Sequence, residues 1–205
     1  SPQLIPTFSL WYIGMLYDYW MYRPDSAFVT DKLAGTRDVL WFFHKYQQAD
    51  GSLKGVPYWL FTDWVEDRPG WNGGAAPFGR DGFSAVLDLR LLGAFQPAAR
   101  WERNLGMTAY GGEYGRRASV LKETIRATYW DEAKGLFADT PEKSVYSQHA
   151  NALAILTETA TPEQFPGITQ HMLTDSSLAP ASIYFKYYLH LALVKTGLGN
   201  DYLKW

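Results

Sequence analysis

The apolar residues of this chain recur mostly with the spacing of α-helices. In residues 5–22 nearly every position is apolar or aromatic and Asp18 is the only charge, which predicts a helix buried on most of its faces. Its length approaches that of a membrane span, but its tyrosines and Asp18 carry too many polar groups for bilayer hydrocarbon. We therefore expect an inner helix, interrupted at Arg23 and Pro24, and no membrane insertion.

Six further segments show helical spacing of their apolar positions: residues 26–48, 81–105, 110–130, 148–158, 162–174 and 182–197. The first of these is predicted to be an outer helix capped by Asp25 or Ser26. We expect a disturbance of the second segment at Pro97 and a loop or an interrupted helix start at the glycines of residues 111–115. Residues 200–205 can begin another helix.

A faint repeat links two of the predicted connections. The segment KYQQADGSLKG at residues 45–55 ends a helix in an acidic, glycine-bearing turn, and ATYWDEAKGLFAD at residues 127–139 repeats this about 80 residues later. Residues 131–145 are predicted to be a short irregular or hairpin segment. Inner and outer helices that alternate, with short connections on one side and long ones on the other, are typical of an α/α toroid.

The number of helices limits how much of such a ring the chain can form. A closed toroid of six hairpins, the (α/α)6 barrel, needs twelve helices, and the sequence offers about seven. The predicted fold class is therefore all-α, a single domain over residues 1–205 that supplies a little over half of the ring. The exposed apolar faces of its first and last helices would then be covered by further chain of a parent protein or by self-association.

The longest stretch without helical spacing, residues 56–79, is rich in aromatic residues. It contains Trp59, Trp64 and Trp71, in a chain with nine Trp, fourteen Tyr and eleven Phe. Long loops in compact domains are commonly functional, and aromatic rings stack on the apolar faces of sugars. Two interpretations of the aromatic residues stay open, a carbohydrate pocket and the filling of a wide helical core.

Composition excludes several classes of protein and site. Hydrophobic residues make up 47% of the 205 residues, which is unlike a disordered chain, and a net charge of −2 is unlike a nucleic-acid-binding protein. There is no Cys, and His44, His171 and His190 lie far apart, so we expect neither a metal site nor a cofactor. The sequence contains neither a nucleophile elbow nor a Walker-type phosphate loop.

Carboxylates are concentrated in residues 62–71, where Asp63 and Glu66 lie among tryptophans. Glycoside hydrolysis uses a pair of carboxyl groups, so the composition of this loop suits that chemistry. In the alternative interpretation Asp63 caps a turn while Glu66, Asp67 and Arg68 form a solvated ion pair. No distance between these groups follows from the sequence, because neighbouring side chains of an extended segment point to opposite faces.

A second candidate group begins the predicted helix 148–158. Ser147, Gln148 and His149 stand at its start, where side chains and backbone N–H groups can bind the hydroxyls of a ligand. Ser147 is more simply an N-cap, and a lone histidine such as His149 is more often structural than catalytic.

Several segments together resemble the catalytic domain of bacterial α-L-rhamnosidases, glycoside hydrolase family 78: IPTFSLWYIGMLYDYW, DGSLKG, YWLFTDWVED, FGRDG, YSQHANALAIL and ASIYFKYYLHLALVKTGLGNDY. The resemblance implies an (α/α)6 fold and the hydrolysis of terminal α-L-rhamnosides with inversion. In that family the general acid precedes the segment that resembles IPTFSLW, and the base is a glutamate after the segment that resembles GNDYLKW. Neither motif is present, so the resemblance assigns no catalytic residue here, and we expect the isolated chain to be inactive or nearly so.

The resemblance also implies a set of sugar-binding residues and a compartment. Asp63 and Trp64 match the family's Asp-Trp loop beside the sugar, and Gln148 matches a glutamine near a helix start. The expected substrate-binding residues are Trp59, Asp63, Trp64, Glu66, Trp71 and Gln148. The implied partner is terminal α-L-rhamnose, and the family resemblance suggests a periplasmic or extracellular location.

Two other classes of function remain open at this stage. The chain can be a non-catalytic carbohydrate-binding or scaffold domain, in which the tryptophans of residues 56–79 bind sugar. It can also belong to another α/α-toroid glycosidase, such as an unsaturated glucuronyl hydrolase. A uronic acid would require Arg or Lys in the pocket, and only Arg68 and Arg80 lie near the loop, which favours a neutral deoxysugar.

Overall fold

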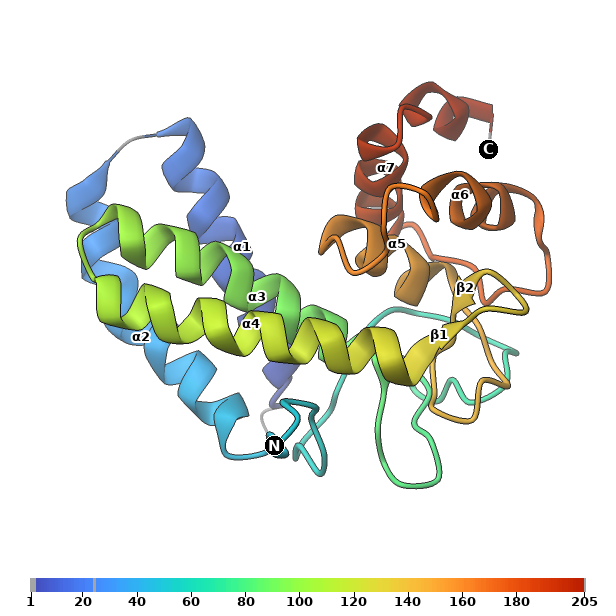
Figure 1. The fold of residues 1–205 in the computed structure, drawn as a ribbon, viewed down its shortest axis with the longest axis horizontal. Coiled ribbons are helices and arrows are strands. Elements are labelled where there is room, and N and C mark those ends of the chain that lie inside the picture. Colours follow the sequence, from blue (N-terminus) through green and yellow to red (C-terminus); the bar gives the residue numbers. More distant parts are fainter. Residues whose placement is uncertain (1–2, 24, 205) are drawn as a thin grey trace.

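Helices dominate the part of the chain that the structure, a computed structural model, describes, namely residues 3–23 and 25–204 (Figure 1). The helices are α1 (Pro6–Tyr22), α2 (Ser26–His44), α3 (Ala85–Asn104), α4 (Thr108–Tyr129), α5 (Gln148–Leu156), α6 (Phe165–Thr174) and α7 (Lys186–Lys195), followed by the 3₁₀ helix η1 (Gly199–Lys204). Two short antiparallel strands, β1 (Trp130–Asp131) and β2 (Leu136–Phe137), form a hairpin. Every segment that was predicted to be a helix or a hairpin therefore contains that element. Pro24, where an interruption was predicted, and Trp205, at the end of the last predicted helix, lie outside the described residues.

The first helix begins and ends as its sequence predicts, but its burial differs from the prediction. Pro6 stands in its first turn, and Asp25 caps α2 by accepting a hydrogen bond from the Phe28 N–H at 3.0 Å. Only one stripe of α1 is buried, and Met15 and Met21 on other faces are 67% and 61% exposed. The expectation that this helix is buried on most faces is wrong for the described chain. No described helix is both long and apolar enough to cross a membrane.

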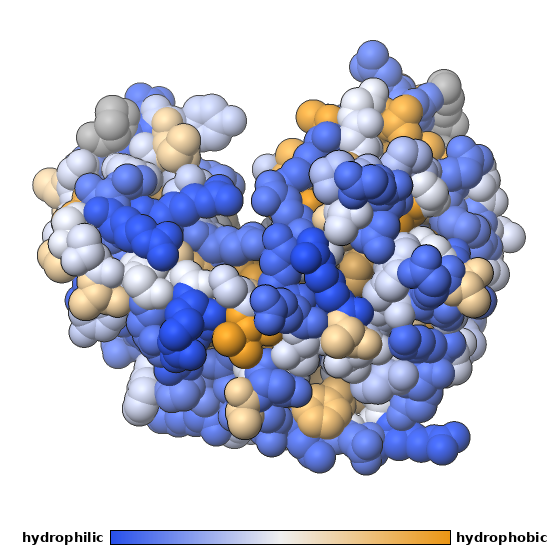
Figure 2. All heavy atoms as spheres, in the orientation of Figure 1, coloured by the Kyte–Doolittle hydropathy of each residue, from blue (hydrophilic) through white to orange (hydrophobic). Residues whose placement is uncertain are grey.

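The helices are arranged in two layers. Helices α1, α3, α5 and α7 pack against one another in that order, while α2 packs on α1 and α3, α4 on α3, and α6 on α5. The sequence of α3 suits an inner position, because it has apolar residues at consecutive positions and therefore on several faces. Leu91 and Leu92, for example, are both fully buried. Figure 2 shows a deep notch between the arm that holds α1 to α4 and the arm that holds α5 to α7.

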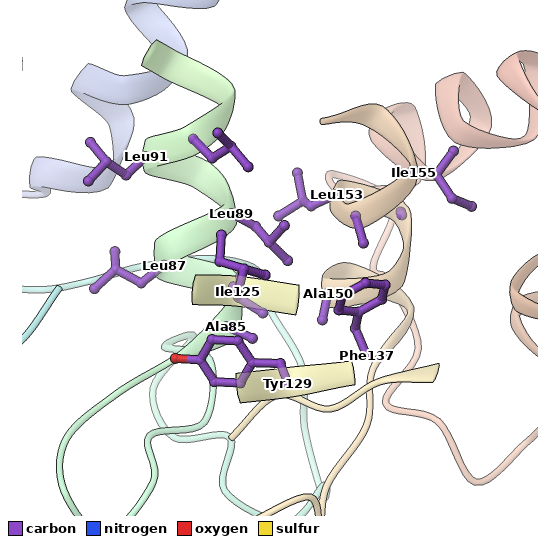
Figure 3. Close-up of a cluster of buried hydrophobic side chains, with 14 of the residues drawn as sticks. Ala85, Leu87, Leu89, Leu91, Ile125, Tyr129, Phe137, Ala150, Leu153 and Ile155 are labelled. Atoms are coloured by element: carbon purple, nitrogen blue, oxygen red, sulfur yellow. The ribbon is translucent and has the colours of Figure 1, made fainter. Parts of the chain in front are cut away.

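The core joins the two arms through side chains of four elements. Leu89 of α3, Ile125 of α4, Phe137 of β2 and Leu153 of α5 lie close together in Figure 3, and each is at most 3% exposed. Burying a large apolar side chain stabilises a fold by roughly 1.5–3 kcal/mol. The contact of α3 with α4, β2 and α5 therefore connects the two arms through buried apolar side chains.

Helix α3 continues through Pro97, as the predicted segment 81–105 does, and the disturbance at Pro97 stays a prediction. One local prediction is wrong, and packing explains it. Residues 111–115 lie inside α4 and form no loop. A Cβ atom at Gly111 would lie 2.9 Å from the Ala99 carbonyl oxygen, so these glycines allow α4 to approach α3 closely.

The faint repeat corresponds to a structural one with three copies. In each, an aspartate accepts a hydrogen bond from the backbone N–H two residues later: Asp50 from Ser52, Asp131 from Ala133 and Asp175 from Ser177. A buried leucine follows each of these aspartates: Leu53, Leu136 and Leu178. The sequence comparison missed the third copy, which lacks the glycine and the flanking aromatic residue of the first two.

The first two of these turns are attached to the next inner helix by one buried side chain each. Asp88 of α3 accepts a hydrogen bond from the Leu53 N–H at 2.8 Å, and Asn151 of α5 accepts one from the Phe137 N–H at 2.9 Å. Each stands four residues after the N-cap of its helix. The connections that precede α3 and α5 are therefore held near the N-terminal ends of these helices, where the candidate site lies.

Candidate functional site

Asp63, the aspartate of the predicted loop, is fully buried and organises three segments of the chain. Its Oδ1 accepts hydrogen bonds from the Trp64 N–H at 2.9 Å and from the Ser182 hydroxyl. Its Oδ2 accepts bonds from the Ser182 N–H and from His149 Nε2, both at 2.7 Å. Burial, the largest single influence, raises the pKa of Asp63, but the bonds from His149 and Ser182 outweigh it and leave the pKa below its usual value.

His149 stands at the start of α5 with its ring fully buried between two aromatic rings. The ring centroids of Trp71 and Phe185 lie 4.6 Å and 4.4 Å from its own. Burial lowers the pKa of His149 by more than the hydrogen bond to Asp63 raises it, so the ring is neutral at pH 7 and its Nε2–H donates to the carboxylate. In the part of the chain that the structure describes, its buried Nδ1 has no hydrogen-bond partner.

Arg90 supports the same segment from α3. Its guanidinium is fully buried and donates to the Phe61 carbonyl oxygen at 2.7 Å and to the Thr7 carbonyl oxygen at 2.8 Å. It also stacks on the Trp11 ring at 4.6 Å. Burial lowers the pKa of Arg90 to about 10, which keeps the group charged at pH 7. Arg90 therefore fixes α1 and the segment before Asp63 relative to each other.

Five aromatic side chains from three separate segments gather around this anchor: Phe8, Trp59, Phe61, Trp64 and Tyr184, which we call the aromatic patch. Phe61 is buried at its centre, with ring centroids at 5.1 Å to Trp64, 5.2 Å to Trp59, 5.6 Å to Phe8 and 6.1 Å to Tyr184. Trp64 is 59% exposed. The patch thus presents exposed ring faces on a fixed buried base.

The local sequence explains why the loop can bring these rings together. The Gly74 carbonyl oxygen accepts hydrogen bonds from the N–H groups of Thr62 and Asp63, and a Cβ atom at Gly74 would lie 2.6 Å from the Phe61 ring. Only glycine fits at this position, which also has a φ of +78°. The Trp59 indole N–H donates to the Gly73 carbonyl oxygen at 2.7 Å, so the glycine-rich return of the loop holds Trp59 as well.

The structure places the expected binding residues in three different surroundings. Trp59 and Trp64 belong to the aromatic patch, and Asp63 lies buried beneath it. Trp71 lies against His149, on the buried side of this base. With no exposed surface, Asp63 can hold its neighbours in place but cannot contact a sugar directly.

Gln148 and Glu66 are not among the rings of the patch. The Gln148 amide donates to the Met172 carbonyl oxygen at 2.8 Å and accepts from the Ala181 N–H at 2.7 Å, so it joins the connections around α5. It also lines a separate cavity of about 370 Å³ together with Arg68. Glu66 is exposed, and no salt bridge among the described residues joins it or Asp67 to Arg68, so the predicted ion pair is absent from the described chain.

Sequence reasoning did not identify Phe8, Tyr184, Ser182 or Arg90 as members of this site. Phe8 and Tyr184 lie in ordinary apolar helical patterns, and the hydroxyl of Ser182 resembles that of any residue before a helix. An available signal was Arg90 itself, a charge that, like Asp88, lies within the mostly apolar start of α3. In the described residues no group of three or more His, Cys, Asp or Glu could hold a metal ion.

No protein-family model and no curated protein matches the chain. Among solved structures, a rhamnosidase from Klebsiella oxytoca with rhamnose bound matches 100% of this chain over 37% of its own, with a TM-score of 0.82 and 18% identity. A GH78 family rhamnosidase of Bacillus sp. GL1 matches 98% of this chain over 21% of its own, with a TM-score of 0.83 and 21% identity. The resemblance to rhamnosidases is therefore confirmed at the level of the fold, and the chain spans well under half the length of either enzyme.

Proposed function

We propose that this chain is part of the catalytic domain of a glycoside hydrolase of family 78 and that its aromatic patch binds terminal α-L-rhamnose. The observation that carries the proposal is the gathering of exposed rings around Phe61, over a base fixed by Asp63 and Arg90. An apolar sugar face, such as the side of a deoxysugar that carries the methyl group, stacks on exposed rings of this kind. The similarity to a rhamnosidase with rhamnose bound supports the choice of sugar.

The charges around the patch favour a neutral sugar over a uronic acid. The carboxylate of Asp63 and the guanidinium of Arg90 are both buried and already hydrogen-bonded within the chain. A uronate would require an accessible guanidinium or ammonium group among the rings. Arg68, the nearest candidate in sequence, lines the separate cavity beside Gln148. An unsaturated glucuronyl hydrolase is therefore the weaker proposal.

In this proposal the chain binds and orients the sugar, while other parts of a longer enzyme transfer protons. An inverting glycosidase holds an acid and a base roughly 6.5–9.5 Å apart, on opposite sides of the sugar ring. Asp63 is unsuited to either role because it has no exposed surface and its pKa is lowered. We assign it, with His149 and Ser182, the role of positioning the Trp64 segment.

The ring expected from the sequence belongs to the same proposal. The inner row α1, α3, α5 and α7, with α2, α4 and α6 outside it, supports an (α/α)6 toroid of which this chain forms a part. Further helices of the parent enzyme, or a second copy of the chain, would then cover the exposed faces of α1.

Titration of the chain with L-rhamnose, followed by saturation-transfer NMR, tests the proposal. We expect binding that Trp64→Ala abolishes and that Tyr187→Ala, which removes an exposed ring from α7, leaves unchanged. Binding of D-glucuronate in preference to L-rhamnose would overturn the choice of sugar. The alternative of a non-catalytic binding domain predicts the same binding but no gain of hydrolysis when the flanking parts of a family 78 enzyme are fused to the chain.

A further inference from the structure

A groove runs between the outer helices α2 and α4, separate from the aromatic patch. One cavity in it, of about 320 Å³, is lined by residues that include Trp41 and Tyr110. A second cavity, of about 240 Å³, is lined by residues that include Gln47 and Arg116. Both cavities are also lined by His44 and Arg117, so they adjoin and form one elongated groove.

One end of the groove is aromatic. Trp41 is 58% exposed and Tyr110 is 46% exposed, and these residues come from opposite walls, α2 and α4. Beneath them lie Leu40 of α2 and Phe95 of α3, which are both fully buried. Exposed aromatic side chains above an apolar floor provide a surface on which a flat apolar face can stack.

The polar groups at this end are held in fixed positions. Arg37 donates two hydrogen bonds, each of 2.8 Å, to the carboxylate of Glu102, which is 1% exposed. The guanidinium of Arg37 also stacks on the Tyr110 ring at 3.8 Å. Arg37 therefore already restricts the Tyr110 ring on one face, so the ring loses less conformational entropy when a ligand binds.

The junction of the two cavities is organised by Arg117. Its guanidinium donates to Glu113 at 2.7 Å and to the Gln47 amide oxygen at 3.0 Å, and it lies 2.5 Å from His44 Nδ1. Arg116 donates to the same carboxylate at 2.8 Å. Hydrogen bonds from both arginines lower the pKa of Glu113 to about 2, so it is ionised at pH 7. The groove thus offers ionised donors and an acceptor, already held in place, halfway along its length.

The charges of the groove balance. Two carboxylates, Asp38 and Glu113, line it together with Arg37, Arg116 and Arg117, and the buried Glu102 behind the lining pairs with Arg37, so no sign is in excess. A ligand with a net charge would therefore gain little from the groove. Paired charged groups can still hydrogen-bond to hydroxyls through their remaining donors and lone pairs.

We propose that the groove between α2 and α4 is a second binding site, for a neutral oligosaccharide about two sugar units long. One unit stacks on Trp41 and Tyr110, and the next lies over Arg117 toward Gln47. The two cavities, of about 320 and 240 Å³, together fall within the range of roughly 300–1,000 Å³ for small-molecule sites. We propose a small ligand and not a protein, because a stable protein partner would need to bury about 800 Å² of the surface of this chain. This proposal stands whether or not the aromatic patch binds rhamnose.

Fluorine NMR of the chain labelled with 5-fluorotryptophan tests the proposal with cellobiose, maltose and xylobiose as probes. The Trp41 resonance is assigned as the one that is missing in Trp41→Phe. We expect at least one disaccharide to shift this resonance saturably, with a Kd on the order of 1 mM, and to bind more tightly than its own monosaccharide. Tyr110→Ala should weaken this binding by roughly tenfold or more.

The matched control is Trp64→Ala, which removes the exposed tryptophan of the aromatic patch and should leave the shift of Trp41 unchanged. A Trp41 resonance that none of the three disaccharides moves, in a chain whose circular dichroism is that of the folded state, would overturn the proposal. So would a shift that disappears in Trp64→Ala, because the sugar would then bind at the patch. Loss of rhamnose binding alone would bear on the proposed function and not on this groove.

Discussion

His149 Nε2 lies 2.7 Å from Asp63 Oδ2, although the two residues are 86 positions apart in the sequence and neither has an exposed side chain. Together with Ser182, this contact joins the Trp64 segment to the beginnings of α5 and α7. The exposed rings above it therefore depend on buried polar groups that never meet solvent. Such groups are costly to disturb, because each leaves its partners unpaired.

Asp63→Asn should destabilise the chain by about 3 kcal/mol. The amide N–H₂ group would face the N–H groups that now donate to the carboxylate, and the negative charge that accepts these hydrogen bonds would be lost. Urea unfolding monitored by circular dichroism measures this loss. Glu66→Gln, the same kind of change on an exposed residue of the same loop, is the control and should have little effect. Equal stabilities of the two variants would contradict the positioning role of Asp63.

Asp139→Asn should reduce the loss of stability that accompanies a rise in pH from about 4 to about 7. Asp139 is fully buried, accepts a hydrogen bond from the Ser147 hydroxyl at 2.6 Å, and has a pKa that burial raises to about 7. A raised carboxyl pKa means that the folded chain binds the proton more tightly than the unfolded chain, so stability is lost as this group ionises.

The difference between the two unfolding curves isolates this group from the other buried acids. We expect the free energy of unfolding of the variant, relative to the parent, to increase by on the order of 2 kcal/mol between pH 4 and pH 8. Asp67→Asn, on an exposed loop position with a φ of +53° that asparagine accepts, should run parallel to the parent. A difference that does not change with pH would show that Asp139 titrates normally.

The helices could be predicted from the sequence because their signals are local. Apolar spacing, the Asp25 cap and the proline at the start of α1 all act within a few residues of one another. The loop or interrupted start expected at residues 111–115 is absent because contacts with α3 decide the course of α4 there. Tertiary packing overrides local preference where two helices pack closely.

The candidate site could be predicted only in part, for the same reason. Trp59, Asp63 and Trp64 are close in sequence, and their unusual composition marked the loop. Phe8 and Tyr184 reach the same patch from α1 and from the segment before α7, and nothing in their own surroundings indicates this. Whether the carboxylate of Asp63 faces solvent or His149 depends on how these distant segments assemble, and the residues next to Asp63 do not indicate it.

Arg90→Met should destabilise the chain by roughly 2–4 kcal/mol, because it leaves the carbonyl oxygens of Phe61 and Thr7 without their charged donor. Chemical denaturation gives the size of the effect. Arg100→Met, an exposed arginine on the same helix, is the matched control and should cost far less. If both substitutions cost the same, Arg90 does not hold these two segments together.

The isolated chain should hydrolyse p-nitrophenyl α-L-rhamnoside at a rate no greater than that of a Trp64→Ala variant. The patch can bind and orient a sugar, but the proposed acid and base lie outside this sequence, and their loss removes most of the rate. Release of p-nitrophenol measures turnover. Robust hydrolysis that copurifies with the chain and falls in Trp64→Ala would show that the chain contains its own catalytic groups.

Self-association should depend on the exposed face of α1. Met15 is 67% exposed and Tyr12, one turn before it, is 39% exposed, and apolar patches of this kind drive association in water. We expect light scattering to give a mass above the 23.3 kDa of one chain, rising with concentration. Met15→Glu should lower this mass, whereas Met107→Glu, at a partly exposed methionine beside α4, should not. A stable monomer at every concentration would mean that the α1 face needs no cover, and this would count against a ring that further chain or a second copy completes.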